Sequence, residues 1–113
     1  YSLTCPDRRP LNVESLDLAA LGSLRFEKVD TGRFRAVDLA YAAARMGGTA
    51  PTVLNAANEV AVKLFLDGKI KFTDIADLVA SALESHSPRE VDSLETVYDA
   101  DREARSEVVK CTG

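Results

Sequence analysis

The sequence contains few of the residues that build common catalytic and metal sites. Its 113 residues include no tryptophan, one histidine, one methionine and two cysteines. Cys5 and Cys111 lie near opposite ends, with neither CxxC spacing nor a neighbouring histidine, which excludes the common zinc motifs. A disulfide between the two ends is geometrically allowed, but we favour two thiols in a reducing cytoplasm.

Long apolar runs and basic clusters are also missing. The longest apolar stretches, such as residues 39–44, are far shorter than the ~20 residues that span a bilayer, so we expect a soluble chain with no membrane partner. Fourteen basic and 18 acidic residues give a net charge of −4 and are spread along the sequence. Nucleic acid is therefore not an expected partner, because no positive patch would attract phosphate groups.

The start of the sequence carries no recognisable signal peptide. Residue 1 is tyrosine, and no charged stretch followed by an apolar run precedes the first polar residues. We therefore expect a fragment or a processed product of a larger cytoplasmic protein.

Residues 1–33 are predicted to be a connective segment. Prolines and glycines interrupt short apolar pieces there, and residues 16–21 could form one helical turn that ends at Gly22. Leu24 and Phe26 then alternate with charged residues, which predicts a strand with one buried face. Such a strand needs a partner outside this chain, so we expect the isolated chain to dimerise or aggregate through it.

Residues 34–113 are predicted to form a helical domain. Apolar residues recur with helical spacing in four stretches, over residues 35–47, 50–66, 73–85 and 92–108. Gly47 and Gly48 should end the first helix, Thr73 should cap the third, and Asp92 with Glu95 should form a capping box for the fourth. The fold class is therefore mainly α: a linker strand followed by a small antiparallel four-helix bundle.

The predicted interior is rich in alanine. Alanine lets helices approach closely but supplies little apolar area, so we expect the larger side chains to contribute much of the burial. These are Tyr41, Leu54, Leu64, Phe65, Phe72, Leu78 and Leu83.

Two polar stretches are candidate sites. Residues 47–49 could offer backbone N–H groups to an anion, but no Walker ending follows, and we favour a plain pair of helix caps. Asn55, Asn58 and Glu59 share one side of the second helix at i, i+3 and i+4. We predict interdomain or interhelical hydrogen bonds for them, ahead of a solvated face or contact with a substrate.

Other titratable residues are not assigned to catalysis. Asp99 and Asp101 lie two residues apart on a predicted helix and so cannot share a proton, and we expect ion pairs with Arg102 and Arg105 instead. His86 lies where a cation would favour the end of a helix dipole, without an orienting group next to it in sequence.

One stretch closely resembles a known family. Residues 47–62, GGTAPTVLNAANEVAV, are similar to the C-terminal region of 1-deoxy-D-xylulose 5-phosphate reductoisomerases, in which the run LNAANE is characteristic. Residues 16–27 resemble that family's linker, residues 33–41 the start of its helical domain, and residues 70–75 and 99–105 its later helices. The chain departs from the pattern at Cys5 and at residues 102–103. The resemblance covers nearly the whole chain.

The resemblance implies the C-terminal domain of a larger α/β enzyme. Family members convert 1-deoxy-D-xylulose 5-phosphate to 2-C-methyl-D-erythritol 4-phosphate in non-mevalonate isoprenoid synthesis, with NADPH and Mg²⁺ or Mn²⁺. In the family the cofactor, metal and phosphate sites lie N-terminal to the matching stretch. The resemblance therefore implies no catalytic, cofactor or metal residue here, an inactive fragment, and partners in the N-terminal domains of the same chain and in a homodimer. The alternative is a free-standing helical interaction module.

Overall fold

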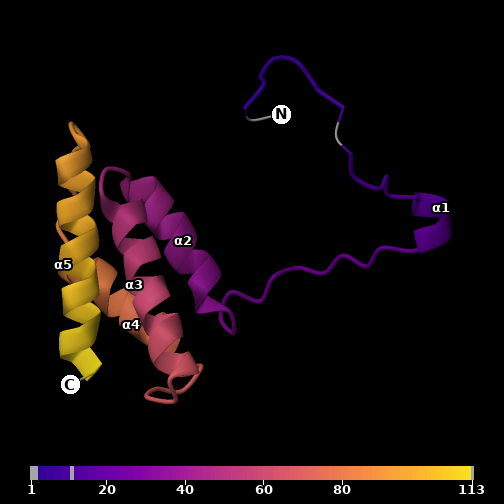
Figure 1. The fold of residues 1–113 in the computed structure, drawn as a ribbon. Helices are drawn as coiled ribbons and strands as arrows, with labels where there is room; N and C mark the ends of the chain where they lie inside the picture. Colours follow the sequence, from indigo (N-terminus) through magenta and orange to yellow (C-terminus); the bar gives the residue numbers. More distant parts are fainter. Residues whose placement is uncertain (1–2, 11, 113) are drawn as a thin grey trace.

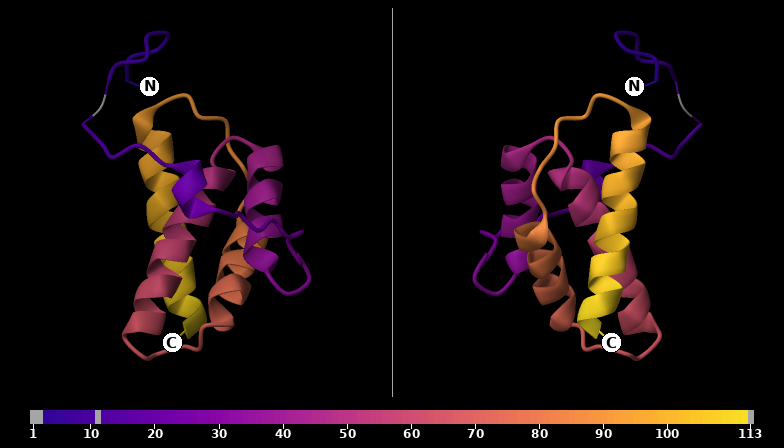
Figure 2. Two further views of the ribbon diagram at one scale, coloured as in Figure 1. Left: turned by 90° about the vertical axis from the view of Figure 1, so that its right-hand side faces the viewer. Right: turned by 90° about the vertical axis from the view of Figure 1, so that its left-hand side faces the viewer.

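The computed structural model describes residues 3–10 and 12–112, which contain five α-helices. These are α1 (Leu18–Leu21), α2 (Arg35–Met46), α3 (Ala50–Leu66), α4 (Asp74–Ser85) and α5 (Leu94–Thr112). Helices α2 to α5 lie side by side, with their connecting loops at alternate ends of the group (Figure 2). Helix α3 contacts α2, α4 and α5. The predicted mainly α fold is confirmed.

The predicted strand does not form among the described residues. The segment before α2 extends away from the bundle and carries only the short helix α1 (Figure 1). Leu24 and Phe26 are 58% and 87% exposed, so neither side chain lies on a buried face. The prediction is therefore wrong for this chain, because no second strand within the described ranges offers the hydrogen bonds that a sheet requires.

The structure confirms the predicted ends of the first two helices. Asp17 caps α1 by accepting hydrogen bonds from the backbone N–H groups of Ala19 and Ala20, and Gly22 ends the helix at a φ of 79°. Gly47 ends α2 at a φ of 68°, and its N–H donates to the carbonyl of Ala43. Both helix ends are confirmed, since only glycine adopts these positive φ values without strain.

The capping contacts of α4 and α5 differ from those that the sequence predicts. Thr73 precedes α4, but its side chain forms no capping hydrogen bond. The Asp92 and Glu95 capping box is wrong: Ser93 Oγ accepts the N–H of Thr96 at 3.3 Å, and Asp92 instead accepts from the Thr96 hydroxyl at 2.6 Å. Ser93 immediately precedes the first helical residue, so its hydroxyl is the one within reach of the first-turn N–H groups.

The core is built mainly from alanine and valine. Its buried members are Ala43, Ala50, Val53, Ala56, Ala57, Val79, Ala82, Leu83, Ala100, Ala104 and Val108. Leu83 is 6% exposed, and Leu54, Leu64 and Leu78 pack against this cluster in partly buried positions. Tyr41 and Phe72, which we expected to be buried, are 61% and 71% exposed, and Phe65 is 37% exposed. Helices that meet through alanines leave too little space between them for aromatic rings.

In the part of the chain that the structure describes, no helix combines the length and the apolar character needed to cross a membrane.

Candidate functional site

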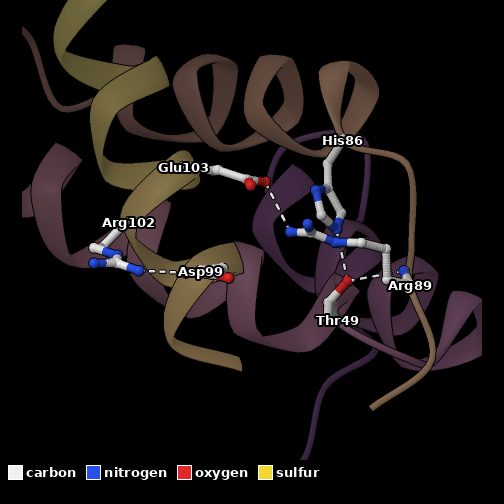
Figure 3. Close-up of polar contacts among 6 residues, drawn as sticks. All are labelled: Thr49, His86, Arg89, Asp99, Arg102 and Glu103. Carbon is white, nitrogen blue, oxygen red and sulfur yellow. Dashed lines mark hydrogen bonds and ion pairs between the residues drawn. The ribbon is translucent and has the colours of Figure 1, made fainter. Parts of the chain in front are cut away.

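A polar cluster joins the α2–α3 turn to the loop between α4 and α5 (Figure 3). Thr49, at the start of α3, is fully buried. Its Oγ1 lies 2.7 Å from Nε2 of His86 and accepts the backbone N–H of Arg89 at 3.0 Å. The backbone N–H of Thr49 donates in return to the Arg89 carbonyl at 3.0 Å. His86 and Arg89 thus form three hydrogen bonds with a single buried threonine.

Glycine is required beside this threonine. Gly48 has a φ of 53°, and a Cβ at this position would lie 2.3 Å from the carbonyl oxygen of Arg89. The loop therefore rests directly on the backbone of the turn, in a space that any side chain would fill. Gly48 thus provides close packing as well as positive φ, whereas the sequence alone indicated only a helix cap.

The cluster extends to α5 through a surface ion pair. The Arg89 guanidinium donates to Glu103 at 2.8 Å, and both side chains are partly exposed. Burial lowers the pKa of His86, and the charge of Arg89 lowers it further, while the charge of Glu103 acts in the opposite direction. The neutral form of His86 is therefore favoured at pH 7. A neutral imidazole beside a hydroxyl suits a general base, but the hydroxyl of Thr49 is buried and cannot reach a substrate.

A second polar network joins α3 to α5. Asn55 Nδ2 donates to Glu59 at 3.1 Å, and the other oxygen of Glu59 accepts from Arg105 at 2.7 Å. Arg105 also forms two hydrogen bonds with Asp101, at 2.7 and 3.0 Å. The hydrogen bond from Arg105 lowers the pKa of Glu59, with a smaller effect from Asn55. The bonds to Asp101 and then Glu59 raise the pKa of Arg105.

The predicted ion pairs on the last helix are confirmed. Asp101 pairs with Arg105, and Asp99 pairs with Arg102 (Figure 3). These partners account for both aspartates, which therefore do not act together as an acid and base pair.

Asn58 lies apart from these networks, on a groove between α2, α3 and α4. Its side chain forms no hydrogen bond with the described part of the chain. A cavity of about 230 Å³ is lined by Ala36, Leu39, Leu54, Asn55, Asn58, Ile75, Ala76 and Val79. A hollow of about 460 Å³ shares four of these residues and is also bordered by Arg33, Phe34, Arg35, Val62, Phe72, Thr73 and Asp77. The structure thus places Asn55 and Glu59 together and Asn58 on the groove, and their interdomain role stays a prediction.

The described residues do not fit a divalent metal or a dinucleotide. Within residues 3–10 and 12–112, no group of three or more histidine, cysteine or acidic side chains could hold a metal ion. The sequence also has no GxGxxG loop to receive a pyrophosphate.

Sequence comparisons identify relatives along the whole chain. A family model described as DXP reductoisomerase C-terminal domain matches residues 1–107. The 1-deoxy-D-xylulose 5-phosphate reductoisomerase of Cupriavidus pinatubonensis is 50% identical over 111 residues, which cover 98% of this chain and 28% of the relative. That of Shouchella clausii is 52% identical over 110 residues, or 96% of this chain and 29% of the relative. The chain thus spans less than a third of the length of these relatives.

Solved structures give the same match. The 1-deoxy-D-xylulose 5-phosphate reductoisomerase from Zymomonas mobilis, in complex with NADPH, superposes with a TM-score of 0.86 at 42% identity, covering 98% of this chain and 29% of that one. A reductoisomerase in complex with NADPH, fosmidomycin and magnesium gives a TM-score of 0.78 at 38% identity, covering 98% of this chain and 29% of that one. This chain therefore belongs to the family of DXP reductoisomerase C-terminal domains.

Proposed function

We propose that this chain is the C-terminal structural domain of an NADPH- and divalent-metal-dependent reductoisomerase that converts 1-deoxy-D-xylulose 5-phosphate to 2-C-methyl-D-erythritol 4-phosphate. Residues 1–33 would connect the catalytic part to the bundle of residues 34–113, and the bundle would brace the catalytic part. NADPH and Mg²⁺ or Mn²⁺ would be held by the N-terminal domains of the same chain. By itself, the chain would have no activity.

The observation that carries this proposal is the extent of the likeness. Identity of 50% continues over 98% of the chain, so it includes the connective segment as well as the bundle. A free-standing interaction module that had borrowed only the helices would have no reason to keep the segment before α2. The solved relatives include complexes with NADPH and with magnesium, which supports the same cofactors for the complete enzyme.

The connective segment has a surface suited to packing against further polypeptide. In the described part of this segment and at Phe34, which follows it, these large apolar side chains are exposed: Leu3, Val13, Leu16, Leu18, Leu21, Leu24, Phe26, Val29 and Phe34. An exposed apolar series of this kind indicates an interaction surface. We propose that these side chains are buried against the N-terminal domains, and that Asn58 and the groove beside it face the same partner.

The location and assembly of the enzyme are part of the same proposal. Two exposed thiols, Cys5 and Cys111, fit a reducing compartment, and we place the enzyme in the cytoplasm. We further propose a homodimer, since exposed apolar residues of the segment could also serve a second copy.

A chimera tests the proposed function. The matching 28% of the Cupriavidus pinatubonensis enzyme would be replaced by this chain, and NADPH oxidation would be followed with 1-deoxy-D-xylulose 5-phosphate and Mg²⁺. We expect the chimera to turn over substrate, because half of the residues are identical over the exchanged part. The relative truncated before the exchange point serves as the negative control.

Two outcomes would contradict the proposal. One is a chimera that folds and binds NADPH but does not turn over. The other is turnover by the 113-residue chain alone, which would require catalytic groups within it.

A further inference from the structure

The end of the bundle that carries the α2–α3 turn is closed by a small number of contacts. Thr49 donates its N–H to the Arg89 carbonyl, and its hydroxyl oxygen accepts the Arg89 N–H. The imidazole of His86 completes the set at 2.7 Å. We call residues 86–89 together with Thr49 the turn latch. In the described part of the chain, the Arg89 ion pair with Glu103 also ties the latch to α5.

The hydrogen-bond donors and acceptors around Thr49 indicate which protonation state of His86 the latch requires. The Thr49 oxygen already accepts one N–H, from Arg89, and its own hydrogen needs an acceptor because the residue is fully buried. Neutral His86 with its proton on Nδ1 offers Nε2 as that acceptor, and both the oxygen and the hydrogen of the Thr49 hydroxyl are then paired. Protonated His86 can only donate from Nε2. The Thr49 hydroxyl hydrogen would then lose its acceptor, since no other partner for it exists among the residues that the structure describes.

The charges around His86 act on its protonation in opposite directions. The α4–α5 loop contributes the guanidinium of Arg89, a like charge that opposes an imidazolium. Helix α5 contributes Glu103, whose charge favours protonation of His86, and Glu107, which lines the same cavity of about 200 Å³ beside His86. The side chains that α3 and α4 place around this cavity, Val53, Ala82 and Ser85, do not titrate. Burial of the imidazole has the largest effect on the pKa of His86, and it opposes protonation of the ring.

We propose that His86 makes the turn latch sensitive to pH, so that protonation of this histidine releases the α4–α5 loop from the α2–α3 turn. The latch is closed while His86 is neutral. Protonation reverses the direction of one hydrogen bond, leaves a buried hydroxyl unsatisfied and places a cation beside Arg89. The inference concerns the 113-residue chain itself and does not depend on the proposed function.

The difference between the pKa of His86 in the folded and the unfolded chain sets the direction of the pH dependence of latch opening. Because the pKa of His86 is lowered on folding, the unfolded chain takes up the proton first as pH falls below about 6.5. The stabilising contribution of the latch is thus complete above the unfolded pKa, and is lost progressively between that value and the folded pKa. Opening that takes up one proton becomes more favourable by at most about tenfold for each pH unit in that window.

Amide hydrogen exchange on the whole chain tests the proposal. His86 is the only histidine, so its ring resonances report its titration and its tautomer without ambiguity. We expect a midpoint below 6.5 with the proton on Nδ1 in the neutral form. Protection of the Thr49 and Arg89 amides, corrected for intrinsic exchange, should fall through this titration by up to about tenfold per pH unit. The amide of Ala61, in the middle of α3, should keep its protection.

Variants separate the latch from general acid unfolding. His86→Gln stays neutral, so Thr49 and Arg89 should lose their pH-dependent exchange. Glu103→Gln should move the His86 midpoint down, and Arg89→Met should move it up. A midpoint at or above 6.5, constant protection across the titration, or the same pH dependence in His86→Gln would each overturn the proposal. The titration and exchange of the unmodified chain decide it even if a variant does not fold.

Discussion

Replacement of Gly48 by alanine tests how closely the α4–α5 loop packs on the α2–α3 turn. An added Cβ would lie 2.3 Å from the Arg89 carbonyl oxygen and 3.1 Å from its carbonyl carbon. The obstructing atoms are backbone, so the clash cannot be relieved by rotating a side chain. The loop must move, and this strains or breaks the hydrogen bond from the Thr49 N–H to the same oxygen.

The magnitude has two separate parts. Alanine at a positive φ costs about 1 to 2 kcal/mol, because Cβ approaches the following carbonyl. Overpacking against a rigid neighbour adds roughly 1 to 3 kcal/mol. Gly68→Ala isolates the first part, because Gly68 has a φ of 71° and a Cβ added there would have nothing within 4 Å. We therefore expect Gly48→Ala to lower the free energy of unfolding by about 2 kcal/mol more than Gly68→Ala.

Urea unfolding followed by the helical circular dichroism signal measures both variants. The midpoint should shift further for Gly48→Ala, with an unchanged slope if the unfolded chain exposes the same surface. Equal losses within about 0.5 kcal/mol would refute the reasoning, because the close contact would then contribute nothing beyond the conformational cost.

Further predictions concern the core, the connective segment and the polar residues of α3. Leu83→Ala should lower the free energy of unfolding by about 2 to 5 kcal/mol, measured by urea unfolding, because this side chain is buried in the core; a loss below about 0.5 kcal/mol would show that it faces solvent. Phe26→Ser should leave the unfolding of the bundle unchanged and reduce self-association in analytical ultracentrifugation, and an unchanged association constant would contradict an exposed apolar contact there. The hydrogen bond from Arg105 lowers the pKa of Glu59, so this ion pair should stabilise the chain at pH values above the ordinary carboxylate pKa. The stabilisation should be lost as the pH falls through the pKa of Glu59 in the folded chain. In Glu59→Gln, this part of the pH dependence of the urea midpoint should disappear. Asn58→Ala should barely change the stability of this chain but reduce turnover of the chimera, and full turnover would remove Asn58 from the proposed interdomain contact.

The helical elements were predictable because their signals are local. Gly22 and Gly47 end helices by adopting φ values that other residues avoid, and this property is carried by the residue itself. The same holds for the ion pair of Asp101 with Arg105, since a spacing of four residues on a helix brings the two side chains together. The sequence predicts the cap of α5 one residue too early, because Asp92 and Ser93 are both suitable caps and the sequence alone does not choose between them.

Burial could be predicted only in part. Apolar periodicity correctly predicts that the helix face containing Leu83 is buried. It does not show which large apolar side chains the packed helices can accommodate. Tyr41 and Phe72 were expected inside and lie outside, since the helices approach each other through alanines that leave no room for rings. The strand at Leu24 and Phe26 failed for a related reason, as a strand exists only when another supplies its hydrogen bonds.

The sequence by itself determined which stretches of this protein are helical, where α1 and α2 end, and which family it resembles, because these depend on residues close together in the chain. Only the tertiary structure decided that Thr49 meets His86 and Arg89, from 37 and 40 residues away, and that Gly48 must leave space for a carbonyl of that loop. Contacts across such separations depend on how the helices pack. No local spacing encodes them.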